Sequence, residues 1–386
     1  MRLRLPLKDL QAATAVVAAV ATKANTPMPA LGNILFIAEK GVVRLEGTDI
    51  ETQVVATVPG VIEEEGRTTI EAGRLSQLVK LFPAGSDVLL EAKGSKAQIT
   101  CETNEYKLLT MPVEDFPDWM REPATTRLRI EQKVLRNMLA AVDYAVASGK
   151  DGRRVLFGIH VELRDNQLRM TATDGKKLAR ISVSVGEVDG AGTASITLPI
   201  KPAGELRRVL GDSGPIDIEL SARQISFTMD NITIRTQAID GKYPDCDAVI
   251  PKEFAFEAGF DRDRILSAVR RAGIVANDSN RSIILQFEPG NCVFKSMAYD
   301  VGSFSGKAPI EYTGDQIRVG FNCDYLTETL GCFPDPNLKV HLKNSNAPVI
   351  FRSAKEPDRL ALLMPIKLSS VATEVGEAAD EASGDE

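Results

Sequence analysis

The chain repeats one pattern three times, and the spacing of the repeats sets its domain organisation. Each repeat opens with a short apolar run that leads into an amphipathic helix, near Leu3, Leu128 and Phe256. The matching segments TDIETQVVATV and TDGKKLARISV place Thr48 and Thr173 125 residues apart. A period of this length is the size of a domain and is far longer than the repeat of a solenoid. The sequence therefore predicts three similar domains.

Within each repeat, the order strand, helix, several strands occurs twice. In the second repeat, the strand-like run 127–130 precedes the first helix and the run 196–199 precedes the second. This pattern predicts an α+β fold in which each domain places two helices on one face of antiparallel sheets. The predicted apolar stripe of the first helix is Leu135, Met138, Leu139, Val142 and Ala145. The predicted strands are 156–163, 167–173, 178–185, 216–220, 224–229 and 232–238.

The cysteines and the N-terminus indicate a cytoplasmic protein without a membrane segment. Near the N-terminus, Pro6 and Asp9 interrupt what resembles a signal peptide, and no apolar run approaches the length that spans a bilayer. The five cysteines are odd in number and show no CxxC spacing, which favours free thiols in a reducing compartment. These cysteines are Cys101, Cys246, Cys292, Cys323 and Cys332. The predicted N-terminal helix instead has the apolar stripe Leu10, Ala13, Val17 and Val20.

The formal net charge of −7 does not identify a partner, because the acidic residues are unevenly placed. The last stretch, 371–386, holds six acidic residues and no base, so the rest of the chain is near −1. Its composition is typical of a disordered tail. Hydrophobic residues make up 44% of the chain, which is enough for each domain to bury a core.

The predicted helices carry basic residues beside their apolar stripes. On a single helix such residues are more often an ordinary solvated face than a binding surface. Recurrence on equivalent helices of repeated domains favours one common basic surface. The second helix of the third repeat departs from this bias, because it carries Asp324 and Glu328. The basic residues are Arg74, Lys80, Lys133, Arg136, Arg207, Arg208, Arg264, Arg270 and Arg271.

No catalytic motif stands in the sequence. The phosphate-binding patterns GxxxxGK[ST] and GxGxxG are absent, and no nucleophile with a nearby base is found. His160 and His341 lie in strand-like runs without ligand-spaced partners, which favours structural roles. Two acidic pairs fit turns and helix caps better than a Mg²⁺ site. We therefore predict a protein that is not an enzyme and uses no cofactor or metal. The acidic pairs are Asp245 with Asp247 and Asp261 with Asp263.

Six short motifs, in order along the three repeats, resemble the bacterial DNA polymerase III beta subunit family, the sliding clamps. The resemblance covers residues 1–368. It implies clamp domains at 1–121, 126–250 and 254–368, followed by an acidic disordered tail at 369–386. The motifs are LGNILF at Leu31, GTDIE at Gly47, DFPDW at Asp115, TDGKKLA at Thr173, DGKYPD at Asp240 and MPIKL at Met364.

The resemblance implies a head-to-tail homodimer that closes into a ring around double-stranded DNA. A heterologous interface used twice closes such a ring, and basic helix faces that line the hole meet phosphates without reading bases. The protein would then be a processivity factor. The residues that the resemblance places toward DNA are Lys23, Arg74, Lys80, Lys133, Arg136, Lys201, Arg207, Arg208, Arg270 and Arg271.

The resemblance also implies an apolar pocket that binds a short peptide motif of partner proteins. The implied partners are the catalytic subunit of the replicative polymerase, the clamp loader, and other DNA polymerases and repair proteins. Lys176 and Lys177 depart from the usual His-Arg pair of the family, which changes the chemistry of the pocket. On composition alone, plain core packing is the better explanation of the apolar positions. The pocket residues are Leu156, Thr173, Gly175, Lys176, Lys177, Leu178, Pro244, Val249, Asn322, Tyr325, Leu362 and Met364.

For the dimer interface, the resemblance pairs Tyr106 and Leu108 of an edge strand with Ile274 and Val275 of the partner chain. Covering an apolar edge strand removes an aggregation hazard. Two other classes of function remain possible on the sequence alone. A protein scaffold would bind partners without encircling DNA, and an enzyme with an unrecognised site would show a carboxylate or histidine of shifted pKa in a cleft.

Overall fold

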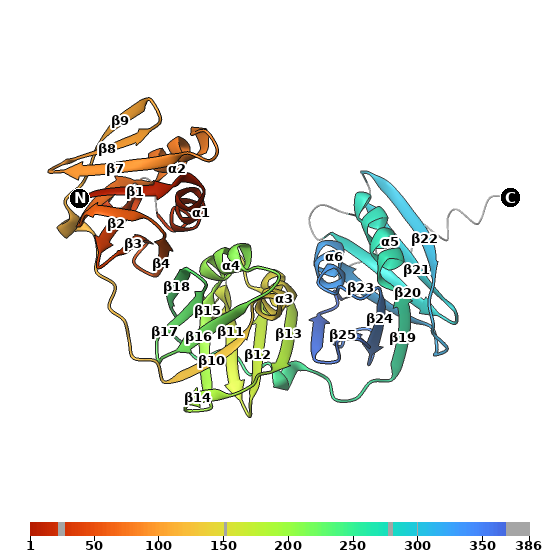
Figure 1. Cartoon of the computed structure of the whole chain (residues 1–386). Coiled ribbons are helices and arrows are strands. Elements are labelled where there is room, and N and C mark those ends of the chain that lie inside the picture. Colours follow the sequence, from red (N-terminus) through yellow and green to blue (C-terminus); the bar gives the residue numbers. More distant parts are fainter. Residues whose placement is uncertain (22–27, 150–152, 277–280, 299, 368–386) are drawn as a thin grey trace. The chain divides into compact units, whose positions relative to one another are not determined.

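The computed structural model describes residues 1–21, 28–149, 153–276, 281–298 and 300–367 (Figure 1). The chain divides into two compact units. Unit one comprises Met1–Arg136, Leu163–Asn166 and Val185–Asp240, and unit two comprises Asn137–Glu162, Gln167–Ser184 and the chain from Gly241. The middle third of the chain therefore contributes to both units. The predicted boundaries of three domains stay a prediction.

The described residues contain six α-helices, at the places where the repeat predicts them. The stripe predicted for the first helix of the second repeat is buried throughout, and so is the N-terminal stripe. The α+β class is thereby confirmed. The helices are α1 (Leu7–Val17), α2 (Ala72–Leu81), α3 (Gln132–Val142), α4 (Ile200–Val209), α5 (Arg262–Ile274) and α6 (Cys323–Gly331).

Two antiparallel sheets form the body of unit one. One has the strand order β5-β1-β7-β8-β9, and the other has the order β14-β10-β16-β17-β18-β4-β3-β2-β6. The five strands of the first sheet are β5 (Val61–Glu64), β1 (Arg2–Pro6), β7 (Asp87–Lys93), β8 (Lys96–Cys101) and β9 (Asn104–Leu109). The nine of the second are β14 (Val188–Gly190), β10 (Thr126–Glu131), β16 (Pro215–Leu220), β17 (Gln224–Met229), β18 (Ile232–Gln237), β4 (Thr52–Val58), β3 (Val42–Thr48), β2 (Asn33–Glu39) and β6 (Gly66–Glu71).

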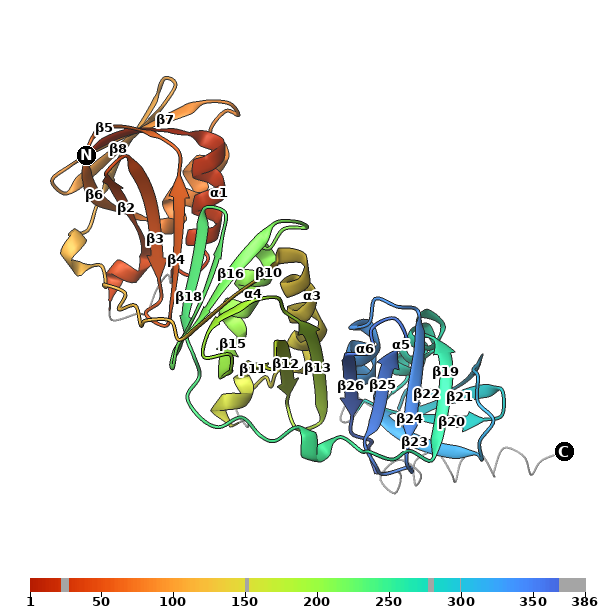
Figure 2. The same cartoon turned by 60° about the horizontal axis from the view of Figure 1, so that its bottom comes forward.

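The second sheet of unit one joins strands of the first and second repeats. Figure 2 shows β18 beside β4, and the two pair antiparallel with Thr236 opposite Thr52. Helix α1 lies close against β3, because a Cβ atom at Gly47 would be 2.7 Å from the carbonyl oxygen of Val17. Glycine is therefore required there for the helix to pack on the sheet.

Unit two is also built from antiparallel sheets. One has the order β22-β21-β20-β23, and in the other the strands β11-β12-β13-β26-β25-β24-β19 follow one another. The strands of the first are β22 (Gly302–Pro309), β21 (Asn291–Ala298), β20 (Ser282–Glu288) and β23 (Ile317–Asn322). Those of the second are β11 (Gly158–Arg164), β12 (Gln167–Thr173), β13 (Lys177–Ser184), β26 (Arg359–Leu363), β25 (Val349–Ser353), β24 (Asn337–Leu342) and β19 (Phe256–Asp261). The remaining strand, β15 (Ala194–Pro199), leads into α4 in unit one.

The core of unit two lies between α5, α6 and the sheets. Ala268, Val269 and Ala272 of α5 and Leu326 and Leu330 of α6 are all buried in one apolar cluster. Small side chains on α5 let α6 approach it closely. The cluster is completed by buried phenylalanines of the strands, among them Phe287, Phe294 and Phe321.

One predicted strand begins later than expected. Residues Arg154–Phe157 form a 3₁₀ helix (η4) instead of the start of the strand 156–163, and β11 begins at Gly158. The N–H of Leu156 donates to the carbonyl oxygen of Arg153 at 2.8 Å, which closes the 3₁₀ turn. In the same way Ala145 lies in a short 3₁₀ helix, η3 (Asp143–Ala145), after α3 ends.

The repeat extends to individual hydrogen bonds of two hairpins. In the turn from β3 to β4, Thr48 Oγ1 donates to the carbonyl oxygen of Thr52 at 2.8 Å. In the turn from β12 to β13, Thr173 Oγ1 donates to the carbonyl oxygen of Lys177 at 2.7 Å. In both turns an aspartate side chain accepts from the backbone N–H three residues later. The sequence motif TD therefore marks the same turn in both repeats.

Candidate partner pocket and nucleic-acid interface

The apolar positions of the predicted pocket gather in one cluster of unit two. Leu178 of β13 and Leu362 of β26 lie opposite each other in the strand pairing, and both are buried. Leu156 of η4 packs against the cluster and is half-buried. The other members of the cluster are Val155, Tyr243, Cys246, Ile350 and Leu360, with Ile250 and Phe254 packed against them.

The turn from β12 to β13 brings backbone close to this cluster. Thr173 donates its N–H to the hydroxyl oxygen of Tyr243 at 3.1 Å, and its Oγ1 accepts from the N–H of Gly175. Gly175 has a φ of 87° and is exposed, with no atom within 4 Å of the place where a Cβ would stand. The turn therefore uses glycine for its backbone conformation and leaves open space beside it.

Exposed apolar side chains lie at the edge of the cluster. Met364, directly after β26, is 39% exposed, and Val249 in the short helix η5 (Asp247–Val249) is 50% exposed. Pro244 is half-buried. Apolar side chains that stay partly open next to a buried apolar cluster are suited to contact with a second apolar group. The cluster and its edge can therefore accept an apolar segment.

Helix α6 supplies the polar side of the same region. Asn322 caps the helix, because its side-chain oxygen accepts from the N–H groups of Asp324 and Tyr325, both at 3.0 Å. Tyr325 is half-buried, and the ammonium of Lys176 lies 5.8 Å from its ring centre. All twelve predicted pocket residues thus lie within unit two.

The two lysines of the TDGKKLA motif have different environments. Lys176 is exposed, whereas the side chain of Lys177 is 7% exposed and pairs with Glu328 of α6. The ammonium of Lys177 also lies 4.9 Å from the ring centre of Tyr325 and 5.6 Å from that of Tyr144. Lys177 therefore turns away from solvent, and Lys176 stays at the edge.

Buried polar groups beneath the turn stay uncharged. The ring of Tyr243 stacks on His160, with ring centres 4.7 Å apart. Burial raises the pKa of the Tyr243 hydroxyl and lowers the pKa of His160, so each group keeps its neutral form. Burial likewise raises the pKa of the Cys246 thiol to about 11, which makes it a poor nucleophile.

Several residues of this region were not predicted from the sequence. Tyr243 lies in the DGKYPD segment and Cys246 directly follows it, but of the residues 240–246 only Pro244 was predicted to line the pocket. Comparison with DFPDW offered a signal for Tyr243, because Phe116 occupies the same place before Pro-Asp and is also buried. Tyr144 and Glu328 had no such signal, since they reach Lys177 from elements far away in the sequence.

The predicted DNA-facing residues lie on the polar faces of helices, with two exceptions. Arg136 of α3 is half-buried and pairs with Asp212, and its guanidinium also donates to the carbonyl oxygen of Leu210 at 3.4 Å. Lys23 lies outside the described residues. The exposed members are Arg74 and Lys80 on α2, Lys133 on α3, Lys201, Arg207 and Arg208 on α4, and Arg270 and Arg271 on α5.

Some of these exposed bases have carboxylate partners. Lys201 pairs with Asp49 at 2.7 Å, and Arg208 pairs with Glu205 at 2.6 Å. Arg74 pairs with Glu71, which also caps α2. Exposed ion pairs of this kind are weak and exchange readily for other anions.

The predicted dimer residues are found at exposed places. Strand β9 is the edge of its sheet, and Tyr106 and Leu108 lie half-buried on it beside the more exposed Leu109. Ile274, the last residue of α5, is 77% exposed, and Val275 follows it half-buried. An apolar side chain this exposed at a helix end fits an interface.

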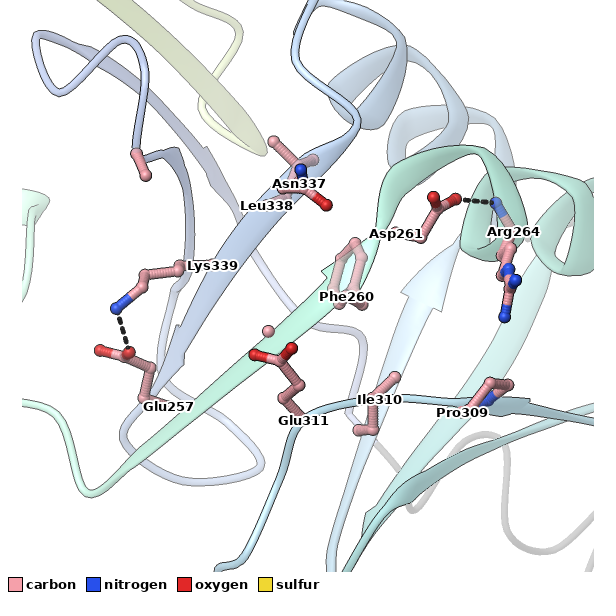
Figure 3. A pocket seen from close by; sticks show the side chains of 12 residues that line it. Glu257, Phe260, Asp261, Arg264, Pro309, Ile310, Glu311, Asn337, Leu338 and Lys339 are labelled. Atoms are coloured by element: carbon pink, nitrogen blue, oxygen red, sulfur yellow. Dashed lines mark hydrogen bonds and ion pairs between the residues drawn. The ribbon is translucent and has the colours of Figure 1, made fainter.

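A cavity of about 530 Å³ beside β19 is lined by both charged and apolar side chains (Figure 3). Glu257 accepts from Lys339 at 2.7 Å, and this bond lowers the pKa of the carboxyl group. Asp261 caps α5 by accepting from the N–H of Arg264. The lowered pKa of the Glu257 carboxyl group is the opposite of what a general acid needs, and the described residues hold no cluster of three potential metal ligands.

The helices of the described ranges also fall short of what crossing a lipid bilayer requires, both in length and in apolar character. Four of the five cysteines are buried, Cys332 is half-buried, and all five are free thiols.

Comparison with known proteins gives consistent matches along the chain. Models of the N-terminal, central and C-terminal domains of the DNA polymerase III beta subunit match residues 3–120, 129–245 and 247–367. The beta sliding clamp of Pseudomonas putida is 29% identical over 366 residues, covering 94% of this chain and 97% of the relative. The beta sliding clamp of Escherichia coli K12 is 27% identical over 348 residues, covering 88% of this chain and 93% of the relative.

Solved structures of sliding clamps have the same fold. The sliding clamp from Pseudomonas aeruginosa bound to griselimycin has a TM-score of 0.91 at 27% identity, covering 95% of this chain and all of that one. The sliding clamp from Bartonella birtlesii bound to griselimycin has a TM-score of 0.90 at 28% identity, with the same coverage. Because models of all three domains of the subunit match in order from residue 3 to residue 367, the chain belongs to the DNA polymerase III beta subunit family, the bacterial sliding clamps.

Proposed function

We propose that this protein is a sliding clamp that encircles duplex DNA and gives processivity to the replicative DNA polymerase. The observation that carries the proposal is the recurrence of exposed basic side chains on equivalent helices of a repeated fold, as with Lys133 on α3 and Arg270 on α5. Loose contacts between such side chains and phosphates are independent of base sequence. Retention on DNA then comes from encirclement and does not require tight binding.

The ring is formed by two copies of the chain joined head to tail. Each copy contributes three clamp domains, at 1–121, 126–250 and 254–368. The exposed edge strand β9 with Tyr106 and Leu108 meets Ile274 and Val275 of the other copy. Two identical heterologous contacts close the ring and cover the edge strand β9.

Partner proteins dock a short apolar segment on the cluster around Leu178 and Leu362. These partners are the polymerase catalytic subunit, the clamp loader, and other DNA polymerases and repair proteins. Met364 and Val249 are open at the edge of the cluster, so an extended peptide can cover them. Lys176 provides a positive charge beside the peptide.

The protein acts without catalysis, without a cofactor and in the cytoplasm. The raised pKa of the buried Cys246 thiol supports the lack of nucleophilic catalysis, because the thiol stays protonated. The role of the tail 369–386, which lies outside the described residues, is most simply that of a solubilising segment.

A retention assay on DNA tests the proposal. The clamp is loaded with a clamp loader on nicked circular DNA, the complex is isolated by gel filtration, and the DNA is then cut once with a restriction enzyme. We expect the protein to stay with circular DNA and to leave linear DNA within minutes. Blocking both ends of the linear DNA with bound protein is the control and restores retention.

The same assay distinguishes a sliding clamp from the main alternative, a protein scaffold. A scaffold that binds partners without encircling DNA would bind the apolar peptide but show no difference between circular and linear DNA. Equal retention on both forms of DNA contradicts the proposal.

A further inference from the structure

Lys177 is a buried lysine that joins three elements of unit two. We propose that Lys177 is a positioning residue, which fixes α6 against β13 and so holds Tyr325 in place at the edge of the partner pocket. It acts through Glu328 and Tyr325 and does not contact the partner peptide itself. This inference rests on the proposed function of the pocket.

The contacts of the Lys177 side chain carry the proposal. Its ammonium pairs with Glu328 of α6 and lies near the rings of Tyr325 of α6 and Tyr144 of η3. Tyr325 and Glu328 are three residues apart, so they share one face of the helix. The Lys177 ammonium therefore contacts two side chains on the same face of α6 from a strand of the neighbouring repeat.

Because the Lys177 ammonium is buried, its stability depends on the side chains that contact it. The Lys177 side chain is 7% exposed, and an ammonium removed from water is stable only when a carboxylate and aromatic faces replace its hydration. Glu328 supplies the carboxylate, and its own side chain is 46% exposed. Removing Glu328 would leave a buried charge unpaired, which forces Lys177 or α6 to move.

The backbone of Lys177 is fixed independently of its side chain. Its N–H donates to Asp174 at 2.8 Å, its carbonyl oxygen accepts from Thr173, and it stands opposite Leu363 in the pairing of β13 with β26. Because these bonds fix the backbone, the side chain of Lys177 extends toward α6 from a defined position. Together with the Asn322 cap, this contact defines where the first turns of α6 lie.

Unit one contains a similar contact with the charges exchanged. Asp49 of the turn from β3 to β4 pairs with Lys201 of α4 at 2.7 Å. In unit two the base is on the strand after the turn and the acid is on the helix. A charged contact between turn and helix therefore recurs at both places where strands of adjacent repeats pair.

The test uses the full-length protein and a capped, uncharged octapeptide whose apolar residues are leucine and phenylalanine, titrated by calorimetry. We expect Lys177→Met to weaken peptide binding about tenfold, and Glu328→Gln to weaken it similarly. In the double variant the loss is no larger than in either single variant, because both remove the same contact. Lys177→Arg keeps the charge and regains most of the affinity lost in Lys177→Met.

Two comparison variants make the result specific. Lys339→Met breaks an exposed pair with Glu257 at 2.7 Å, also in unit two, and is expected to leave peptide affinity unchanged. Lys176→Met removes the neighbouring exposed lysine but leaves the pair of Lys177 with Glu328 in place, and it is expected to weaken binding less than Lys177→Met. Circular dichroism checks that each variant is folded, and Glu328→Gln carries the test where Lys177→Met does not fold.

The outcomes separate this inference from the function of the pocket. If the wild-type protein does not bind the peptide, both ideas fail. If the wild-type protein binds the peptide, two results overturn only the positioning role. One is a Lys177→Met variant that binds as tightly as the wild type. The other is a double variant in which the losses of Lys177→Met and Glu328→Gln add fully.

Discussion

The backbone N–H of Met364 donates to the carbonyl oxygen of Lys176 at 2.8 Å, beyond the last residue pair of β13 and β26. The N–H of Gln237 makes the same bond to the carbonyl oxygen of Glu51, also at 2.8 Å, beyond the pairing of β4 and β18. The connection between adjacent repeats is therefore built twice with the same backbone. Its side chains differ, because Leu178 and Leu362 are replaced by Gln53 and Arg235 in unit one.

The two equivalent turns predict an asymmetric response to substitution. Ile50 has a φ of 79° at the place where Gly175 has a φ of 87°. This conformation costs an L residue about 1–2 kcal/mol, and glycine loses about 0.5–1 kcal/mol through the unfolded state. We expect Ile50→Gly to raise the free energy of unfolding by about 0.5 kcal/mol in urea titrations. Gly175→Ala, the matched reverse change, lowers it, and a loss of stability in Ile50→Gly contradicts this account.

The ion pair of Arg136 predicts a gain in DNA binding. Asp212 is exposed, and its hydrogen bond with Arg136 lowers the pKa of the aspartate carboxyl group. We expect Asp212→Asn to release Arg136 toward phosphate, which raises the affinity for duplex DNA and steepens its dependence on salt. Fluorescence anisotropy over a salt series measures both quantities.

The control for this effect is Asp189→Asn. Asp189 pairs with Arg127 on a strand and not on a helix, at 3.4 Å. Both variants change the net charge equally, so an equal rise in affinity would show that overall charge, and not Arg136, is responsible.

A buried carboxylate predicts part of the acid sensitivity of unit two. Asp335 is 5% exposed and accepts from Ser353 at 2.6 Å and from the N–H of Asn337 at 3.1 Å, and these bonds lower its pKa. A lowered pKa in the folded state gives stability that is present above the unfolded value of about 3.9 and is lost as the pH falls through the folded value.

We therefore expect the stability of the wild-type protein to fall below about pH 4, and the fall to be shallower in Asp335→Asn. At pH 7 the variant is less stable by about 1–3 kcal/mol, because Ser353 loses a charged acceptor. Urea denaturation at several pH values measures the difference. A variant as steep as the wild type below pH 4 argues against this role of Asp335.

The sequence was sufficient for the fold because the fold depends on local patterns. The stripe from Leu135 to Ala145 repeats at helical spacing, and the motif TD recurs at Thr48 and Thr173, so helices and turns were located correctly. The family resemblance rested on the same local motifs. The start of β11 was placed wrongly because the 3₁₀ turn before Gly158 has the apolar composition of a strand.

The contacts between side chains at the candidate site could not be predicted from the sequence. Lys177 and Glu328 are 151 residues apart, and no periodicity connects them. Adjacent lysines look equivalent in TDGKKLA, yet Lys176 is exposed and Lys177 is buried. In the same way, nothing in the sequence of α3 indicates that Arg136 pairs with Asp212, since a pair between a helix and a distant loop leaves no pattern in either segment.

The exposed end of α5 predicts how the ring is held together. Ile274 is 77% exposed at the helix end, and Val275 follows it. In the proposed dimer both side chains are covered by the partner chain, so a charge there must either lose its water or separate the copies. We expect Ile274→Asp with Val275→Asp to sediment as a monomer of 41.8 kDa at concentrations where the wild type is a dimer. Val42→Asp, at an apolar residue that is 42% exposed on β3, should leave the dimer intact. If the double variant is still a dimer, the interface lies elsewhere. If Val42→Asp is also a monomer, an added surface charge separates the copies wherever it is placed, and the result does not locate the interface.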